Sequence, residues 1–131
     1  MKNESIESAL SFHTPDRLLD APLLIFDLHE VVKKIKQEPT WKMGERNAIT
    51  LLKSPQMRIV LIAVRKKTEI NFPHSGNLIS IQIIEGKVNF QSLMLNKGSL
   101  LTLHEDTKHT LYAIEESVIL LTISLRLEKA P

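Results

Sequence analysis

The sequence predicts an all-β protein, a sandwich or barrel of short strands preceded by one short helix. Two observations predict this class. After Ser54, turn-forming residues recur at short and regular intervals. Between them the hydrophobic period is about 2 residues, whereas the segment before Pro39 has the period of about 3.6 that is typical of a helix. The 131 residues, 43% of them apolar, suffice for one domain with one core.

Helix is expected mainly before Pro39, from Leu28 to Gln37. Asp27 stands at the expected N-cap and Glu30 follows three residues later, so each can satisfy an amide donor of the first turn. Lysines lie near the negative end of the helix dipole, and Pro39 is expected to end the helix. A helix this short is marginal alone, so its apolar stripe should pack against another element.

Seven strands are expected in residues 47–131, which form the barrel. Their approximate bounds are Asn47–Lys53, Met57–Arg65, Leu78–Ile84, Lys87–Leu95, Ser99–Leu103, Thr110–Ile114 and Val118–Leu125. Residues 21–46 form the helix and its connection to the barrel. Residues 1–20 show no sustained period and are expected to be a mobile leader, or an arm that becomes ordered against a partner.

The strand Met57–Arg65 is apolar without alternation, so both of its faces should be covered. A second subunit is the simplest cover, which predicts a homodimer. The helix Leu28–Gln37 is the alternative cover within one chain. Lys87–Leu95 alternates instead, as a strand with one face in water does.

Composition excludes several classes of function. The net charge is +2 with 24% charged residues, and no aromatic residues interleave with the basic clusters, so nucleic-acid binding is not expected. No run of about 18 apolar residues predicts a membrane span. The chain has no cysteine and no apolar signal segment, which fits a cytoplasmic protein without disulfides. No nucleophilic triad or phosphate-binding glycine loop can be assembled.

Two short motifs carry a resemblance to a known family. Pro73-His74-Ser75-Gly76 leads through an apolar run to the turn at Gly86, and a second stretch runs from Gly98 to His109. This pattern resembles the cupins over about residues 50–124. In that family the first motif holds a His-x-His pair, a glutamate and a closing glycine, and the second holds a glycine, a proline, a glycine and a histidine. The resemblance implies a jelly-roll β-barrel.

The chain also departs from the family pattern. Gly76 stands at the second histidine of the pair and Ile79 at the glutamate. His104 and Asp106 stand at the proline and glycine of the second motif. At most two of the family's four metal ligands are therefore present, so the resemblance implies a degenerate metal site and names no catalytic residue.

The candidate site consists of three histidines. By the resemblance, His74 and His109 face each other inside the barrel, and His104 could supply a third nitrogen, with Glu105, Asp106 or a water as a further ligand. Imidazoles suit a divalent transition metal such as Zn, Fe, Ni or Cu. The alternative is that these histidines line a pocket without any cofactor.

Three functions follow from these observations. The first is a barrel that binds a small-molecule ligand beside a degenerate metal site. The second is a metal-dependent enzyme of dioxygenase or isomerase type, in which a histidine-bound metal keeps an open coordination position. The third is a sensor or accessory partner of another protein, which rests on the N-terminal arm.

Overall fold

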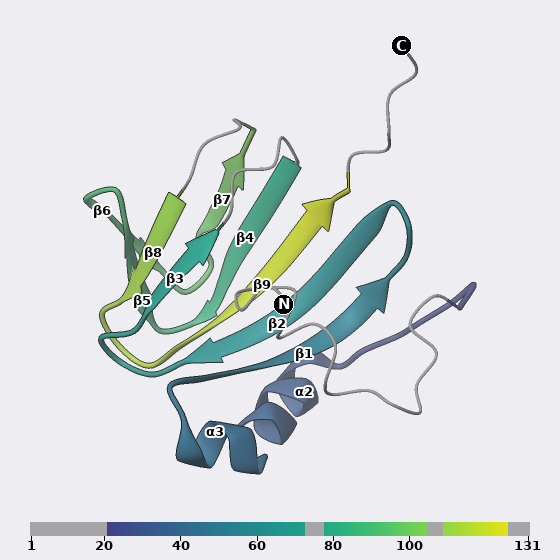
Figure 1. Ribbon diagram of the computed structural model, residues 1–131, viewed down its shortest axis with the longest axis horizontal. Helices are drawn as coiled ribbons and strands as arrows, with labels where there is room; N and C mark the ends of the chain where they lie inside the picture. The colour runs from purple at the N-terminus through teal and green to yellow at the C-terminus, as the bar shows by residue number, and fades with distance from the viewer. Residues whose placement is uncertain (1–20, 73–77, 105–108, 126–131) are drawn as a thin grey trace, which may run out of the picture.

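The chain folds into two antiparallel sheets that face each other around one core, as seen in a computed structural model that describes residues 21–72, 78–104 and 109–125 (Figure 1). The strand order is β1-β2-β9-β4-β7 in the five-stranded sheet and β3-β8-β5-β6 in the four-stranded sheet. The strands are β1 (Arg46–Lys53), β2 (Met57–Val64), β3 (Glu69–Phe72), β4 (Leu78–Glu85), β5 (Lys87–Phe90), β6 (Leu93–Asn96), β7 (Leu100–Leu103), β8 (His109–Ala113) and β9 (Ser117–Ser124). The expected all-β class is confirmed.

The strands differ from the expected ones in two places. Lys87–Leu95 is not one strand, because Gln91 and Ser92 adopt φ values of 48° and 70° and separate β5 from β6. A two-residue turn with positive φ at both positions matches the twist of a hairpin. The strand β3 is not predicted by the sequence pattern, since its four residues are too few to establish a period.

The core lies between the sheets. Ile79, Ile81 and Ile83 of β4 face it, as the period of two predicts, and they pack with Phe72 and Leu111 from the other sheet. Burial of each such side chain contributes about 1.5–3 kcal/mol, so this cluster is the main source of stability in the barrel.

Two short helices precede the barrel, α2 (Leu28–Ile35) and α3 (Pro39–Met43). Asp27 caps α2, because its carboxylate accepts hydrogen bonds from the backbone N–H of His29 at 3.0 Å and of Glu30 at 3.4 Å. Pro39 does not end the helical region as expected. It occupies the first turn of α3, where the N–H that proline lacks would have no helical partner.

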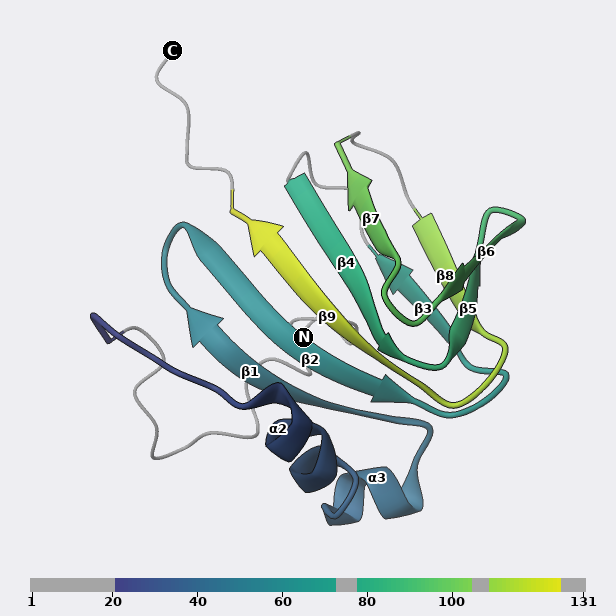
Figure 2. The same cartoon turned by 180° about the vertical axis from the view of Figure 1, so that it is seen from behind.

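The helices cover the outer face of the five-stranded sheet over β1 and β2 (Figure 2). Val32, Ile35 and Trp41 pack there against Leu61 and Ala63 of β2. The second face of β2 is thus covered within one chain at Leu61 and Ala63, by the element that the sequence analysis names as the alternative to a second subunit. Dimerisation itself stays a prediction.

In the described part of the chain, no helix is long and apolar enough to span a membrane.

Candidate functional site

Four strand ends meet at one end of the barrel, which we call the histidine end (Figure 1). There β3 ends at Phe72 and β7 at Leu103, while β4 begins at Leu78 and β8 at His109. Phe72 and His109 are paired across β3 and β8. His74 follows Phe72 by two residues in the sequence but lies outside the described residues. The topology therefore brings the backbone of His109 to the end of the barrel at which the cupin resemblance puts the site.

His104 belongs to the outer side of the five-stranded sheet. Along β7, Leu101 and Leu103 pack against the core, so Thr102 faces outward. His104 is two residues further along the chain and therefore belongs to the same side as Thr102. His104 is exposed and borders a hollow of about 250 Å³, whose lining includes Ser80 and Thr122 from the outer face. The described residues group His104 with hydroxyl side chains on the outside rather than with inward-facing ligands.

The inward side of the barrel offers few metal donors among the residues described. No group of three or more His, Asp or Glu side chains comes together there or elsewhere in the described ranges. Ile79, which stands at the position of the cupin glutamate, is 9% exposed and packs in the core. A buried aliphatic side chain at this position cannot supply the carboxylate oxygen that the family's site uses.

Arg58 is the residue at this end that the sequence pattern does not single out. It is two residues from Val60, which faces the core, so Arg58 lies on the same, inward side of β2. The register aligns Arg58 with Ile123, Ile123 with Ile79, and Ile79 with Leu103. Arg58 is partly buried, whereas Ile79 and Ile123 are buried. In this inner row the guanidinium of Arg58 has aliphatic neighbours on the β9 side, and on the other side Arg58 is paired with Lys53 of β1.

An arginine inside the apolar run Met57–Val64 was the available signal for this row. The sequence alone does not tell which face of the strand Arg58 occupies. The pairing of β2 with β9 is needed to decide it. A guanidinium presents a planar fork of donors that matches a carboxylate or phosphate. The inner row can therefore hold an anion against an apolar wall.

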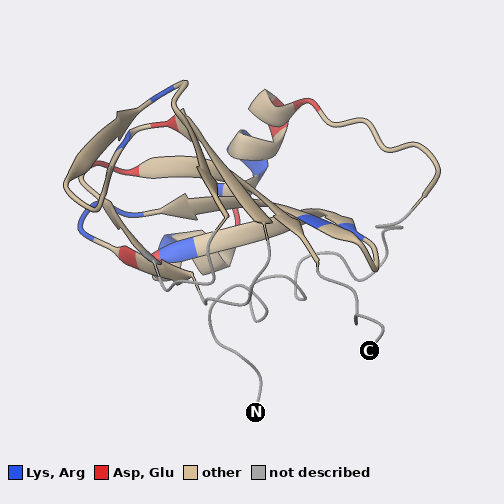
Figure 3. Ribbon diagram, turned by 90° about the horizontal axis from the view of Figure 1, so that it is seen from above, with Lys and Arg blue, Asp and Glu red and all other residues tan. Residues whose placement is uncertain are grey.

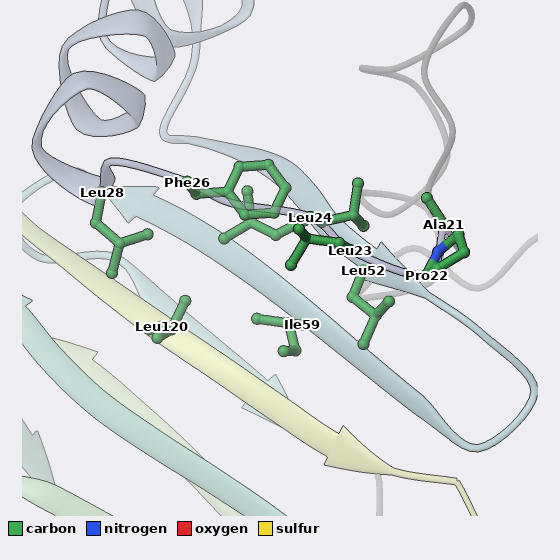
Figure 4. A pocket seen from close by; sticks show the side chains of 10 residues that line it. Ala21, Pro22, Leu23, Leu24, Phe26, Leu28, Leu52, Ile59 and Leu120 are labelled. Carbon is green, nitrogen blue, oxygen red and sulfur yellow. The ribbon is translucent and has the colours of Figure 1, made fainter.

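A larger hollow lies outside the barrel, between the segment 21–27 with Leu28 at its end and the sheet (Figure 4). Its volume is about 470 Å³, and Phe26, Leu28, Leu52, Ile59 and Leu120 are among its lining side chains. The lining carries no Asp, Glu, Lys, Arg or His. It offers apolar contact without a group that could orient or activate a substrate.

Charged side chains gather instead at the opposite end of the barrel, which we call the turn end. Lys36 of the α2 C-cap contacts the carboxylates of Glu85 at 3.1 Å and Glu116 at 3.0 Å. Partial burial lowers the pKa of Lys36, but the hydrogen bonds to Glu116 and Glu85 outweigh it and leave that pKa above its ordinary value. Arg65 lies 3.9 Å from the ring centre of Trp41 and contacts Glu116 at 3.5 Å. This network fastens the helices to the barrel.

Comparison with solved structures identifies the fold. The chain is similar to KdgF from Halomonas sp., with 16% identity over 64% of this chain and 82% of that one and a TM-score of 0.55. It is similar to the Cupin_2 domain of an XRE family transcriptional regulator from Enterobacter cloacae, with 12% identity over 64% of this chain and 100% of that one and a TM-score of 0.57. It is also similar to a salicylate 1,2-dioxygenase from Pseudoaminobacter salicylatoxidans, with 14% identity over 83% of this chain and 35% of that one and a TM-score of 0.65.

The fold is therefore that of the cupins, the jelly-roll barrel that the two motifs predict. No family model matches the sequence, and no curated protein does. The similar structures include a dioxygenase and a domain of a regulator, so the fold by itself leaves the activity open.

Proposed function

We propose that this protein is a cupin-fold binding protein whose histidine end takes a small organic molecule with an anionic group. The inner row of Arg58, Ile123, Ile79 and Leu103 supports the proposal. Binding sites for small molecules are mostly apolar with a few placed polar groups, and this row has that composition.

The chemistry of the row favours a carboxylate. Its planar pair of oxygens can accept two parallel hydrogen bonds from one guanidinium, and such charge-assisted bonds are roughly twice as strong as neutral ones. Apolar neighbours strengthen the attraction because they exclude water from it. In this proposal Arg58 supplies the positive charge that a metal supplies in a cupin with a complete ligand set, and Ile79 contacts the apolar body of the ligand.

A matched pair of basic residues tests the proposal. Arg58→Gln removes the inward cation, whereas Lys66→Gln removes an exposed lysine at the other end of β2. Calorimetric titration with benzoate, pyruvate and succinate, and with benzamide as the uncharged control, measures the affinities. We expect at least one carboxylate to bind, with a loss of about tenfold or more, or about 1.4 kcal/mol, in Arg58→Gln only. Equal binding of benzamide, or unchanged binding by Arg58→Gln, would contradict it.

A metal-dependent enzyme is the alternative function, and one observation favours it. His109 begins β8 opposite Phe72, which puts one of the two matching histidines at the histidine end. If a metal binds there, replacement of His74 and His109 by Ala should abolish binding, since a site poor in carboxylates has no ligand to spare. His104→Ala, on the outer side, is the control.

Metal analysis of untagged protein separates the two functions. The binding proposal expects less than stoichiometric Zn, Fe, Ni or Cu, whereas the enzyme requires a bound metal.

A sensor or accessory role is the second alternative. It is supported by the likeness to a domain of a transcriptional regulator, and it adds to the binding proposal a partner protein whose association changes with the ligand.

A further inference from the structure

We infer that the hollow between the segment 21–27 and the five-stranded sheet is a second binding site, which takes the alkyl chain of an uncharged small molecule (Figure 4). We call this hollow the outer hollow. Arg58 belongs to the inner row, whereas its neighbour Ile59 lines the outer hollow, because successive side chains of a strand point to opposite faces. The two sites are therefore separate, and the second does not depend on the proposed function.

One wall of the outer hollow is the sheet, and a β-bulge shapes it. The register of β1 on β2 shifts between Thr50 and Leu52, so Leu51 is the extra residue of the bulge. Two adjacent leucines, Leu51 and Leu52, consequently line the same hollow, whereas a regular strand would turn one of them to the other face. The bulge thus widens the apolar wall by one side chain.

The other wall is the segment 21–27, continued by the first residue of α2. Along it Leu24, Phe26 and Leu28 are half-buried and line the outer hollow, whereas Ile25 is 81% exposed. This alternation is that of an extended chain with one side against the sheet, so the wall spans at most about 14 Å from Leu24 to Leu28. The outer hollow follows this wall and is long rather than round, which suits a chain-shaped ligand.

The chemistry of the lining selects an uncharged apolar ligand. The ten lining residues are alanine, proline, leucine, isoleucine and phenylalanine, so none of their side chains carries a nitrogen or oxygen atom. Residues 21–26 contain no charged side chain, and Figure 3 shows this segment in tan before α2. A charged group would lose its hydration there without gaining a partner, whereas a methylene group is stabilised by leaving water.

The dimensions of the outer hollow suit one small molecule. Its volume of about 470 Å³ lies within the range of about 300–1,000 Å³ that is typical of ligand pockets. The chain itself bounds the hollow on two sides, so a flat bilayer surface cannot enter it, whereas a single alkyl chain can. Each methylene group that enters should strengthen binding about three- to fourfold, because burial of a methylene group is favourable by a nearly constant amount.

Titration of the full chain with 1-hexanol, 1-octanol and 1-decanol tests the inference. Affinities are measured by displacement of the uncharged fluorescent probe N-phenyl-1-naphthylamine. We expect saturable binding of one probe molecule per chain, and an affinity for the alcohols that rises with chain length. The matched control ligand is 1,8-octanediol, which should bind about tenfold more weakly than 1-octanol because its second hydroxyl group enters a lining without hydrogen-bond partners.

Two neighbouring residues of the segment give a matched pair of variants. Leu24→Trp puts a larger side chain into the outer hollow, whereas Ile25→Trp puts the same side chain on the exposed side of the segment. We expect Leu24→Trp to weaken binding of the probe about tenfold or more, and Ile25→Trp to leave it unchanged. Thermal unfolding checks that both variants retain the fold.

Leucine methyl NMR spectra of the wild-type protein locate the ligand without any substitution. On addition of 1-decanol, the methyl signals of Leu52 and Leu120 should shift, since both residues line the outer hollow. Leu93 and Leu100 are the controls, because they are 61% and 63% exposed and do not line it. Their signals should stay unchanged.

Four outcomes overturn the inference. The first is that neither the probe nor any alcohol binds saturably. The second is an affinity that does not change with chain length, or equal binding of 1,8-octanediol and 1-octanol. The third is an equal effect of Leu24→Trp and Ile25→Trp, and the fourth is methyl shifts confined to Leu93 and Leu100. The alcohols carry no carboxylate, and Arg58→Gln should leave their binding unchanged, so the inference and the proposed function fail separately.

Discussion

The two ends of the barrel are built from different kinds of contact. At the turn end, Lys36 joins Glu85 and Glu116, and Arg65 stacks on Trp41 while donating to its backbone carbonyl at 2.9 Å. At the histidine end, the inner row has one guanidinium against aliphatic side chains. The turn end contains a network whose charges satisfy each other, whereas the inner row at the histidine end has an apolar wall beside its guanidinium.

This difference separates stability from binding along the length of the strands. A binding site needs a rigid support that holds its polar groups in place. Here the same strands, β2 and β9, run from the turn end to the histidine end. Substitutions at the turn end should therefore act mainly on the free energy of unfolding.

Gly86→Ala should have the largest effect. Gly86 has a φ of 92°, and an added Cβ would lie 2.2 Å from Ser117 Oγ and 2.4 Å from the carbonyl oxygen of Glu116. We expect a loss of about 3 kcal/mol or more in the free energy of unfolding, measured in urea. Gly98→Ala is the control, because Gly98 has a φ of 93° with nothing within 4 Å of the added Cβ, and it should cost only about 1 kcal/mol. Equal losses would show that backbone conformation alone, and not the close packing, sets the cost.

Arg65→Met should have the next largest effect. It removes the contact with the Trp41 ring, the hydrogen bond to its carbonyl oxygen and the ion pair with Glu116. Together these justify a loss of about 1–2 kcal/mol in the free energy of unfolding. Lys66→Met, at the exposed neighbouring residue, should stay within about 0.5 kcal/mol of the wild type. A loss in Lys66→Met as large as in Arg65→Met would mean that positive charge in general, rather than these contacts, stabilises the turn end.

Lys36→Met should destabilise the protein by about 1 kcal/mol at neutral pH, because two partly exposed ion pairs are lost. The pKa of Lys36 is raised in the folded state, so its contribution is fully present below the unfolded pKa of about 10.4 and is lost as the pH rises through the folded value. Urea unfolding of wild type and variant should differ at pH 8 and converge at strongly alkaline pH. A gap that widens above pH 10 would reverse the sign assigned here.

His104→Ala should have the smallest effect on stability. His104 is exposed at the end of β7, and the described contacts give it no buried partner. We expect a change within about 0.5 kcal/mol in the free energy of unfolding. A larger loss would mean that the histidine end also contributes to stability, which would weaken the contrast between the two ends.

The features that local residue chemistry determines could be predicted from the sequence. The cap at Asp27, the turn at Gly86 and the inward face of Ile81 follow from short-range rules and are present. The turn at Gln91-Ser92 could not be predicted, since neither residue is a glycine or asparagine, the types that usually adopt positive φ.

The candidate site was less accessible to such rules. Whether Arg58 faces inward depends on the pairing of β2 with β9, which joins residues far apart in the sequence. The outward placement of His104 likewise follows from the register of β7 on β4. A family motif locates the end of the barrel that holds the site, but the side of the sheet on which each side chain lies requires the register.

The position of β9 has a consequence for how the protein is made. This strand lies between β2 and β4 in the five-stranded sheet, yet it follows every other described strand in the chain. Until Ser117–Ser124 has left the ribosome, β2 and β4 each lack a neighbour and expose a strand edge on which other chains can aggregate. The pairing of Met57 with Ser124 also closes a long loop, which slows folding. The nascent chain therefore passes through a period of exposed edges that ends only when its last described strand is inserted.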